Sequence, residues 1–333
     1  MNNNLFSSFP KNIKFLRDFD INDVYSPLNL DNSISIFKSI NNIFYLIYST
    51  EKISIIAYNI IQNKKMSQIK KAHKSEIIQL KHYLDKINKR DLLLSLSSFC
   101  LKLWNIINFE CIFKIKSNTR YIISACMLID NNQNYIIEKK YLYEYNQEPI
   151  HVYDLKGNKI NDIKDSMEYC YFIDIYYDIK NSKNYIITGN KGILKSFDFN
   201  KNEVYNIYDN KYYGDNNLSV TINQKKDIIQ IIGSCTSGYI VMWNFNTGEL
   251  LKEIKISIAL FGICLWNENY LFVGHSNGTI ILIDLNNGEE VKVLKGHKNF
   301  VIGIKKIYIS QYGECLISNG SENDKIKIWV NEK

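Results

Sequence analysis

Seven short segments recur along the chain at a nearly constant period. In each, a strand ends in an aromatic or aliphatic residue, the anchor, which is followed by Asn or Asp. Six of them read IIAYNI, LKLWNI, IHVYDL, LKSFDF, IVMWNF and IILIDL, and the seventh, IKIWVN, has one extra residue before its Asn. Successive anchors lie 46, 49, 44, 46, 40 and 46 residues apart. Such a period indicates a repeat protein whose units stack on their neighbours. The anchors are Tyr58, Trp104, Tyr153, Phe197, Trp243, Ile283 and Trp329.

Within each period the sequence pattern is that of β-strands and turns. A turn such as TSGY, SNGT or SEND precedes an alternating strand, and a second turn such as FNTGE or LNNGE follows it. Helical spacing is scarce, and the chain has only 3 prolines. Units of this length with four short strands are typical of propeller blades. We therefore predict an all-β, seven-bladed β-propeller that forms a single domain over residues 1–333.

Two of the repeats resemble a known family. In the last repeat, VLKGHKNFVIGIKKIYISQYGECLISNGSENDKIKIWV, the pair Gly296-His297 precedes Trp329 by 32 residues counted from the histidine. In the second repeat, Ala72-His73 precedes Trp104 by 31 residues. These segments resemble WD40 repeats, whereas the other five keep the strand pattern, the anchor and the turn. The chain as a whole is therefore similar to the WD40-repeat β-propeller family.

The WD40 resemblance implies a structural hydrogen-bond network. In that family the histidine, a Ser or Thr on the second strand, an Asp six residues before the Trp, and the Trp itself are joined. In this sequence the Asp position holds Asn323 in the last repeat and Ser98, Ser237 and Asn277 in others, and Asp324 lies one residue further on. Asn and Ser can still close the turns. The residues that we expect in this network are His73, Trp104, His297, Ser318, Asn323 and Trp329.

The last repeat lacks a fourth strand of its own, because only VNEK follows its third strand. The segment KNIKFLRDF, from Lys11 to Phe19, has strand character and no other place in the repeat pattern. We predict that it completes the last blade, as WD40 propellers commonly do, and that it covers an edge that would otherwise be exposed.

The excess of positive charge is compatible with two kinds of surface. Lys and Arg number 41 against 34 Asp and Glu, a net charge of +7, and these charges are spread along the chain. The densest basic cluster lies near residues 63–74 and contains NKK and IKKAHK. The pattern favours an ordinary lysine-rich surface, and the alternative is a footprint for nucleic acid or acidic lipid.

Cysteine usage and the N-terminus point to a reducing compartment. The 7 cysteines are odd in number and form no C-x-x-C pair, which argues against a zinc ribbon and against a disulfide scaffold. The N-terminal MNNNLFSSFPKNIK lacks the apolar core of a signal peptide, and no apolar run reaches membrane-spanning length. We predict a cytoplasmic or nuclear protein without membrane insertion.

One motif suggests catalysis. Gly274 to Gly278 spells G-x-S-x-G, the nucleophile elbow of α/β-hydrolases, with Ser276 as the nucleophile. That elbow requires a helix after the serine, whereas TIILIDL here reads as a strand, so the motif indicates a hairpin turn. The 5 histidines form no H-E-x-x-H pair, and GNKGILKS lacks the G-K pair of a P-loop. We predict no catalytic residue, metal or cofactor.

The leading functional hypothesis is a non-enzymatic scaffold or adaptor that binds protein or peptide partners within a complex. The alternatives are a nucleic-acid- or chromatin-associated propeller and, third, a serine hydrolase at Ser276. By resemblance to WD40 domains, the loops that enter each blade and the turns before each anchor strand form the upper, partner-binding face. No small-molecule substrate is expected. The candidate residues on this face are Lys74, Tyr212, Tyr213, Phe261, Lys298 and Phe300.

Overall fold

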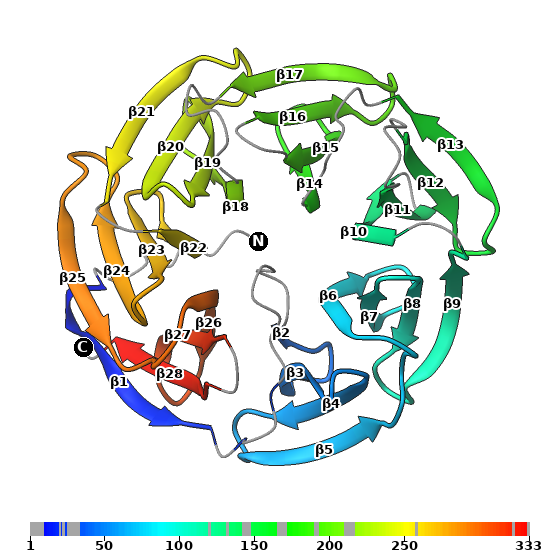
Figure 1. Ribbon diagram of the computed structural model, residues 1–333, viewed down its shortest axis with the longest axis horizontal. Helices are drawn as coiled ribbons and strands as arrows, with labels where there is room; N and C mark the ends of the chain where they lie inside the picture. The colour runs from blue at the N-terminus through cyan, green and yellow to red at the C-terminus, as the bar shows by residue number, and fades with distance from the viewer. Residues whose placement is uncertain are drawn as a thin grey trace. The chain divides into compact units, whose positions relative to one another are not determined.

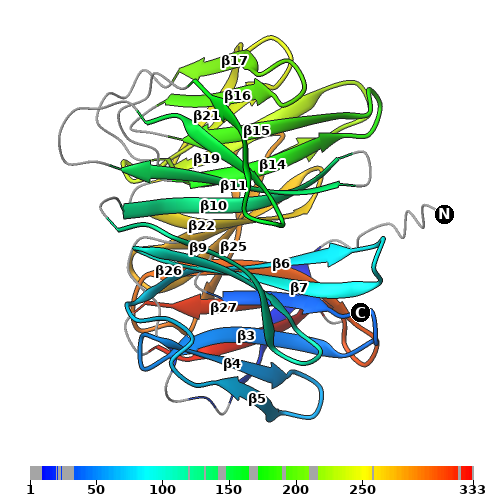
Figure 2. The ribbon, with the colours of Figure 1, turned by 90° about the vertical axis from the view of Figure 1, so that its right-hand side faces the viewer.

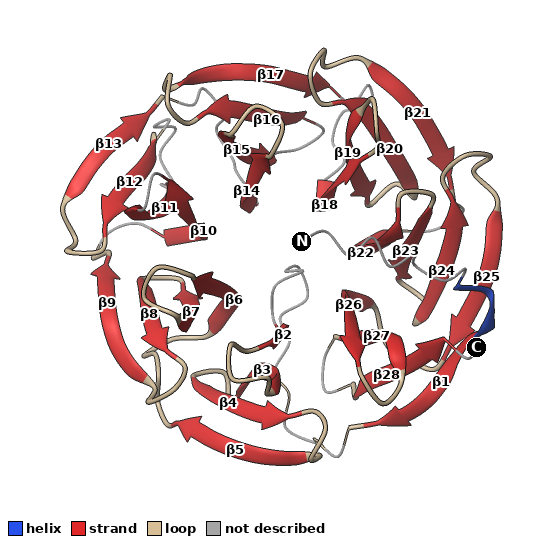
Figure 3. Cartoon of the chain, turned by 180° about the vertical axis from the view of Figure 1, so that it is seen from behind, coloured by secondary structure: helices blue, strands red, loops and turns tan. Residues whose placement is uncertain are grey.

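The computed structural model describes residues 10–19, 21, 24, 34–118, 121–130, 133–141, 148–164, 172–189, 193–209, 217–256, 259–321 and 324–331. These residues form 28 strands and one short 3-10 turn, η1 (Pro10–Asn12), which are drawn red and blue in Figure 3. The strands are arranged in seven sheets of four. The predicted fold class, an all-β seven-bladed propeller, is therefore confirmed.

The structure divides into two compact units, which are described separately, so the prediction of a single domain over residues 1–333 stays a prediction. The four-blade unit comprises Asn32–Asn217 and Asn246–Gly248. Its blades, labelled in Figure 1, each join four strands in chain order. Blade 1 contains β2 (Ile34–Lys38), β3 (Phe44–Thr50), β4 (Ser54–Asn59) and β5 (Lys64–Ile69); blade 2 contains β6 (Ile77–Asp85), β7 (Arg90–Ser97), β8 (Cys100–Asn105) and β9 (Glu110–Lys116); blade 3 contains β10 (Tyr121–Asp130), β11 (Gln133–Tyr141), β12 (Ile150–Asp154) and β13 (Lys159–Ile163); blade 4 contains β14 (Phe172–Asp178), β15 (Lys183–Gly189), β16 (Ile193–Asp198) and β17 (Glu203–Asp209).

The three-blade unit comprises Met1–Asp31, Leu218–Phe245 and Glu249–Lys333. Blade 7 differs from the others because its fourth strand comes from the other end of the chain. Blade 5 contains β18 (Asn217–Gln224), β19 (Ile229–Cys235), β20 (Tyr239–Asn244) and β21 (Leu250–Lys255); blade 6 contains β22 (Leu260–Asn267), β23 (Tyr270–His275), β24 (Thr279–Asp284) and β25 (Glu290–Lys295); blade 7 contains β26 (Val301–Ile309), β27 (Gly313–Gly320), β28 (Ile326–Asn331) and β1 (Ile13–Asp18).

The closure of blade 7 by the N-terminal segment is confirmed. Strand β1 pairs antiparallel with β28, so that Ile13 lies opposite Asn331 and Phe15 opposite Trp329. The backbone N–H of Phe19 then donates to the carbonyl of Ile326 at 2.9 Å. Because β1 covers the hydrogen-bonding edge of β28, no third-strand edge is left open in this blade.

Each sequence anchor lies on the third strand of its blade and marks the same irregularity. In all seven blades, the pairing of the third strand with the fourth shifts register between the anchor and the residue before it, and the extra residue lies on the fourth strand. On the other side, every anchor pairs with a Leu or Ile of the second strand, as Trp104 does with Leu93. A β-bulge of this kind bends and twists a strand. The repeat found in the sequence is therefore a repeat of one bulged strand pair.

The apolar core lies between neighbouring blades. In the four-blade unit, separate clusters of buried side chains join blade 1 to blade 2, blade 2 to blade 3 and blade 3 to blade 4. In the three-blade unit, equivalent clusters join blade 5 to blade 6 and blade 6 to blade 7. Figure 2 shows β3, β4 and β5 running side by side as one sheet. Each blade thus depends on its neighbours to bury its faces.

Candidate functional site: an anchored aromatic and lysine surface

Blade 7 contains a buried hydrogen-bond network around His297. Nε2 of His297 lies 2.7 Å from the hydroxyl of Ser318, and that hydroxyl accepts the indole N–H of Trp329 at 2.8 Å. Nδ1 of His297 lies 3.1 Å from a carboxylate oxygen of Asp324. Since a carboxylate only accepts, the Nδ1 proton faces Asp324, and the Ser318 hydroxyl joins Nε2 to the indole N–H.

The Asp324 carboxylate also holds the loop that enters blade 7. It accepts the backbone N–H groups of Lys298 at 2.7 Å and of Asn299 at 3.3 Å. Burial alone raises the pKa of Asp324, but the hydrogen bond and charge of His297 and the backbone donors outweigh it and lower the pKa to about 2. A second link joins the same loop to the turn before β28, because Ser321 N–H donates to the carbonyl of Phe300 at 2.8 Å.

This anchored loop presents an aromatic ring and a cation. Phe300 is 38% exposed and stacks on Phe261, with ring centroids 5.2 Å apart and an interplanar angle of 12°. Phe261 lies on β22 of blade 6, and its carbonyl accepts the hydroxyl of Ser234 at 2.6 Å. The side chain of Lys298, two residues before Phe300, is exposed. We call Phe261, Lys298 and Phe300 the Phe261/Phe300 surface.

The two glycines of the G-x-S-x-G motif are required by packing. The motif spans the turn from β23 to β24, two antiparallel strands, as the sequence predicted for a hairpin turn. A Cβ on Gly274 would lie 2.2 Å from the carbonyl oxygen of Val301, and a Cβ on Gly278, whose φ is +82°, would lie 2.4 Å from that of His297. The glycines thus let this turn approach the loop that enters blade 7. No helix follows Ser276, so the strand-turn-helix context of a nucleophile elbow is missing from this described turn.

Blade 2 contains a related network without a carboxylate. Nε2 of His73 lies 2.7 Å from the hydroxyl of Ser95, which accepts the indole N–H of Trp104 at 2.7 Å. Nδ1 of His73 lies 2.9 Å from the hydroxyl of Ser97, which itself donates to the carbonyl of Cys100. Burial, together with the charges of Lys102 and Lys114, lowers the pKa of His73 to about 3. This histidine is therefore neutral at physiological pH.

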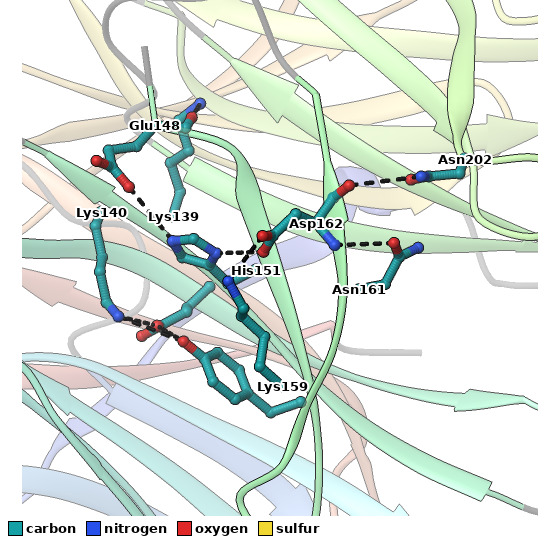
Figure 4. Close-up of polar contacts among 10 residues, drawn as sticks. Lys139, Lys140, Glu148, His151, Lys159, Asn161, Asp162 and Asn202 are labelled. Carbon is teal, nitrogen blue, oxygen red and sulfur yellow. Dashed lines mark hydrogen bonds and ion pairs between the residues drawn. The ribbon is translucent and has the colours of Figure 1, made fainter. Parts of the chain in front are cut away.

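Blade 3 replaces the serine and tryptophan of this network with other side chains. Glu138 occupies the register of Ser95, and Tyr153, on the anchor position, donates to Glu138 Oε1 at 3.0 Å. Lys140 pairs with the same oxygen at 2.8 Å. Figure 4 shows His151 between Asp162 and Glu148, at 2.6 Å and 3.4 Å. Because the two carboxylates face opposite ring nitrogens, one metal ion could not be bound by all three side chains.

The structure brings together some of the predicted residues. Phe261, Lys298 and Phe300 form one surface of the three-blade unit, whereas Lys74 lies in the four-blade unit beside His73, on the connection from β5 to β6. Tyr212, Tyr213 and Asn323 lie outside the described residues.

The sequence pattern missed three members of the two networks. Asp324 supplies the carboxylate next to Asn323, and Ser95 and Ser97 complete the contacts of His73 and Trp104 in blade 2. The signal available for Asp324 was its acidic side chain one residue beyond the expected position. Ser97 likewise lies one residue before the expected Ser98.

No family model matches the sequence, and no curated protein matches it either. Across the described residues, no helix has the length and apolarity needed to cross a membrane. The blades therefore define the class of protein, a seven-bladed β-propeller, and its function must be argued from its surfaces.

Proposed function

We propose that this propeller is a WD40-type, non-enzymatic scaffold or adaptor, and that it binds a protein or peptide partner on the Phe261/Phe300 surface. The observation that carries this proposal is an exposed ring, Phe300, which stacks on the half-buried Phe261 and follows an exposed lysine, on a loop that a buried network holds in place. Aromatic side chains on rigid supports are the usual anchors of protein interfaces. The loop backbone is already ordered by Asp324, so a partner would lose little entropy in ordering it.

The chemistry of the surface indicates the kind of partner segment. Phe300 offers one ring face or edge for an apolar or aromatic side chain. In the described part of the chain, no carboxylate lies within 4 Å of the Lys298 ammonium group, so this charge is available to an acidic residue of the partner. We propose an apolar or aromatic side chain with an Asp or Glu close by as the bound motif.

The test is affinity capture from native cells with a variant of this surface and a matched control. The surface variant is Lys298→Glu with Phe300→Ala. The control is Lys226→Glu with Tyr308→Ala, which makes the same change in charge and removes one aromatic ring. Lys226 follows the first strand of blade 5, and Tyr308 lies near the end of the first strand of blade 7, whereas Phe300 precedes the start of that strand. Lys226 is exposed, and Tyr308 is 59% exposed, so both variants should fold.

We expect specific partners to decrease by about tenfold or more with the surface variant, because truncating an interface anchor costs at least about 1–2 kcal/mol. The control should retain them, and both variants should melt at the wild-type temperature. Partners that persist with the surface variant, or that disappear equally with both variants, would contradict the proposed site.

A further inference from the structure

Six lysines gather on two neighbouring parts of the four-blade unit. Three of them lie on the connection from β5 to β6, within the sequence KKAHK, and three lie on β8 and β9 of blade 2. Five of the side chains are exposed, and that of Lys102 is partly buried. The six are Lys70, Lys71, Lys74, Lys102, Lys114 and Lys116.

Hydrogen bonds and strand register bring the two parts together. The ammonium group of Lys102 donates to the carbonyl of Ala72, which lies between Lys71 and His73. Lys102 pairs with Lys114 across β8 and β9, so the two side chains lie on one face of the sheet. Lys116, two residues further along β9, is on the same face. The effect of Lys102 and Lys114 on the pKa of His73 is a second sign that these charges surround one place.

These lysines lack compensating carboxylates. Among the described residues, none of the six has an Asp or Glu within 4 Å, whereas lysines elsewhere do, for example Lys159 with Asp162 at 2.8 Å and Lys306 with Glu314 at 2.6 Å. The nearest acidic residue along the first segment, Glu76, pairs with Lys52 at 2.9 Å. Uncompensated like charges repel one another and create a positive field that attracts polyanions.

Two exposed aromatic rings lie beside Lys116, at the end of β9. Phe99 and Tyr121 are 38% and 40% exposed, and their ring centroids are 4.7 Å apart at an interplanar angle of 39°. Phe99 precedes Cys100, which pairs with Lys116. The N–H of Ser117 donates to the Phe99 carbonyl at 2.9 Å and so keeps this turn beside the end of β9. Ring faces and uncompensated lysines are thus next to each other.

We propose that this surface binds single-stranded nucleic acid, with phosphates over the lysines and a base stacked on the Phe99–Tyr121 pair. Lysines that follow a strand face can neutralise successive phosphates, and aromatic rings stack with any base. A duplex keeps its bases stacked internally and could use only the lysines. An acidic peptide could likewise use the charges, but it would leave the two rings without a stacking partner.

The experiment measures binding of full-length protein to fluorescent oligouridylate and oligodeoxythymidylate of about 12 nucleotides by anisotropy, over a range of salt concentrations. A duplex of the same length and polyglutamate serve as competitors. The charge variant is Lys71→Gln, Lys74→Gln, Lys114→Gln and Lys116→Gln combined, and the stacking variant is Phe99→Ala with Tyr121→Ala. The charge control neutralises four exposed lysines in turns of the same unit: Lys86, Lys89, Lys156 and Lys180, each changed to Gln.

We expect the wild type to bind both single strands, with an affinity that falls as salt rises. The charge variant should bind more weakly, and the slope of log affinity against log salt should decrease in magnitude by about 2 to 3, since each phosphate contact contributes about 0.7 on a single strand. The stacking variant should lose about tenfold in affinity with an unchanged slope. The charge control should bind like the wild type.

Three outcomes would overturn the proposal. They are the absence of single-strand binding at low salt, an equal loss with the charge control, and stronger binding to the duplex or to polyglutamate than to the single strands. Thermal melting of every variant shows whether the fold is intact. The Lys298→Glu/Phe300→Ala variant should bind nucleic acid normally, so failure of this proposal and failure of the proposed adaptor surface can be told apart.

Discussion

Blades 2 and 7 contain the same three side chains, a histidine, a serine and a tryptophan, but they differ in the fourth. In blade 7 the histidine faces the carboxylate of Asp324, and in blade 2 it faces the hydroxyl of Ser97. The carboxylate accepts two further N–H groups from the loop entering its blade, whereas the hydroxyl donates to Cys100 within its own turn. The fourth residue therefore decides whether the network also anchors the entering loop.

The charge around the two histidines differs as well. Asp324 provides a negative group at His297, whereas burial and, to a smaller extent, the charges of Lys102 and Lys114 lower the pKa of His73. Lys102 and Lys114, which add to this effect on His73, belong to the six lysines that have no described carboxylate within 4 Å. One blade thus uses its network to order a loop, and the other has a network within a positive surface.

The largest change would come from removing the strand that closes blade 7. Deleting residues 1–20 removes β1, exposes the edge of β28 and uncovers the ring of Trp329, which packs edge-on against Phe15 at 5.6 Å. We expect an insoluble or loosely folded protein, with loss of a cooperative thermal transition. Deleting residues 1–9 leaves β1 in place and is the control. A chain without residues 1–20 that melts at the wild-type temperature would contradict this role of β1.

The next largest effect should distinguish the two networks directly. Asp324→Ala leaves the N–H groups of His297, Lys298 and Asn299 without their acceptor and should cost about 3 kcal/mol in the free energy of unfolding. Ser97→Ala removes a single neutral acceptor and should cost about 1 kcal/mol. Urea denaturation measures both values. Equal costs would show that the carboxylate has no special role in blade 7.

The smallest expected effect is a pH dependence that separates the blades. The unfolded chain protonates His73 near pH 6.5, whereas the folded protein does so only near pH 3, so stability is complete above pH 6.5 and falls as the pH decreases toward 3. The contribution of Asp324 is present above about pH 3.8 and is lost as the pH falls through about 2. Between pH 6.5 and 5.5 we expect a loss of about 1 kcal/mol from His73.

Denaturation at several pH values tests this separation. His73→Gln should reduce the slope between pH 6.5 and 5. A smaller slope should remain, because burial also lowers the pKa of His82 although its hydrogen bond to Asp91 opposes that shift. If His73→Gln has the wild-type slope, His73 is not the buried neutral group that its contacts with Ser95 and Ser97 indicate.

Much of the fold could be predicted because each blade repeats one local pattern. A third strand with a large anchor residue recurs at a nearly constant period, and its alternation and flanking turns are local properties of the sequence. The closing strand was predictable by elimination, since the last repeat lacked a fourth strand. Of the candidate site, Phe261, Lys298 and Phe300 could be named, but the stacking of the two phenylalanine rings could not be predicted.

Other features depended on side-chain geometry across strands. Counting back from Trp329 indicated Asn323, yet Asp324 reaches His297, because a turn can place either of two adjacent residues inward. Glu138 was not predicted to replace the serine of blade 3, since a charged residue in a strand usually faces solvent.

The sequence by itself determined the class of fold, the number of blades, the anchors on the third strands, and the N-terminal strand that completes blade 7. These features follow from periodicity and from the need to bury both faces of each blade. Only the tertiary structure decided which residues complete the networks and where charges gather. The lysines of KKAHK and those of β8 and β9 are about thirty residues or more apart in the chain, and they meet because blade 2 folds back so that Lys102 reaches Ala72. Contacts between distant segments depend on register and packing, which no local pattern encodes.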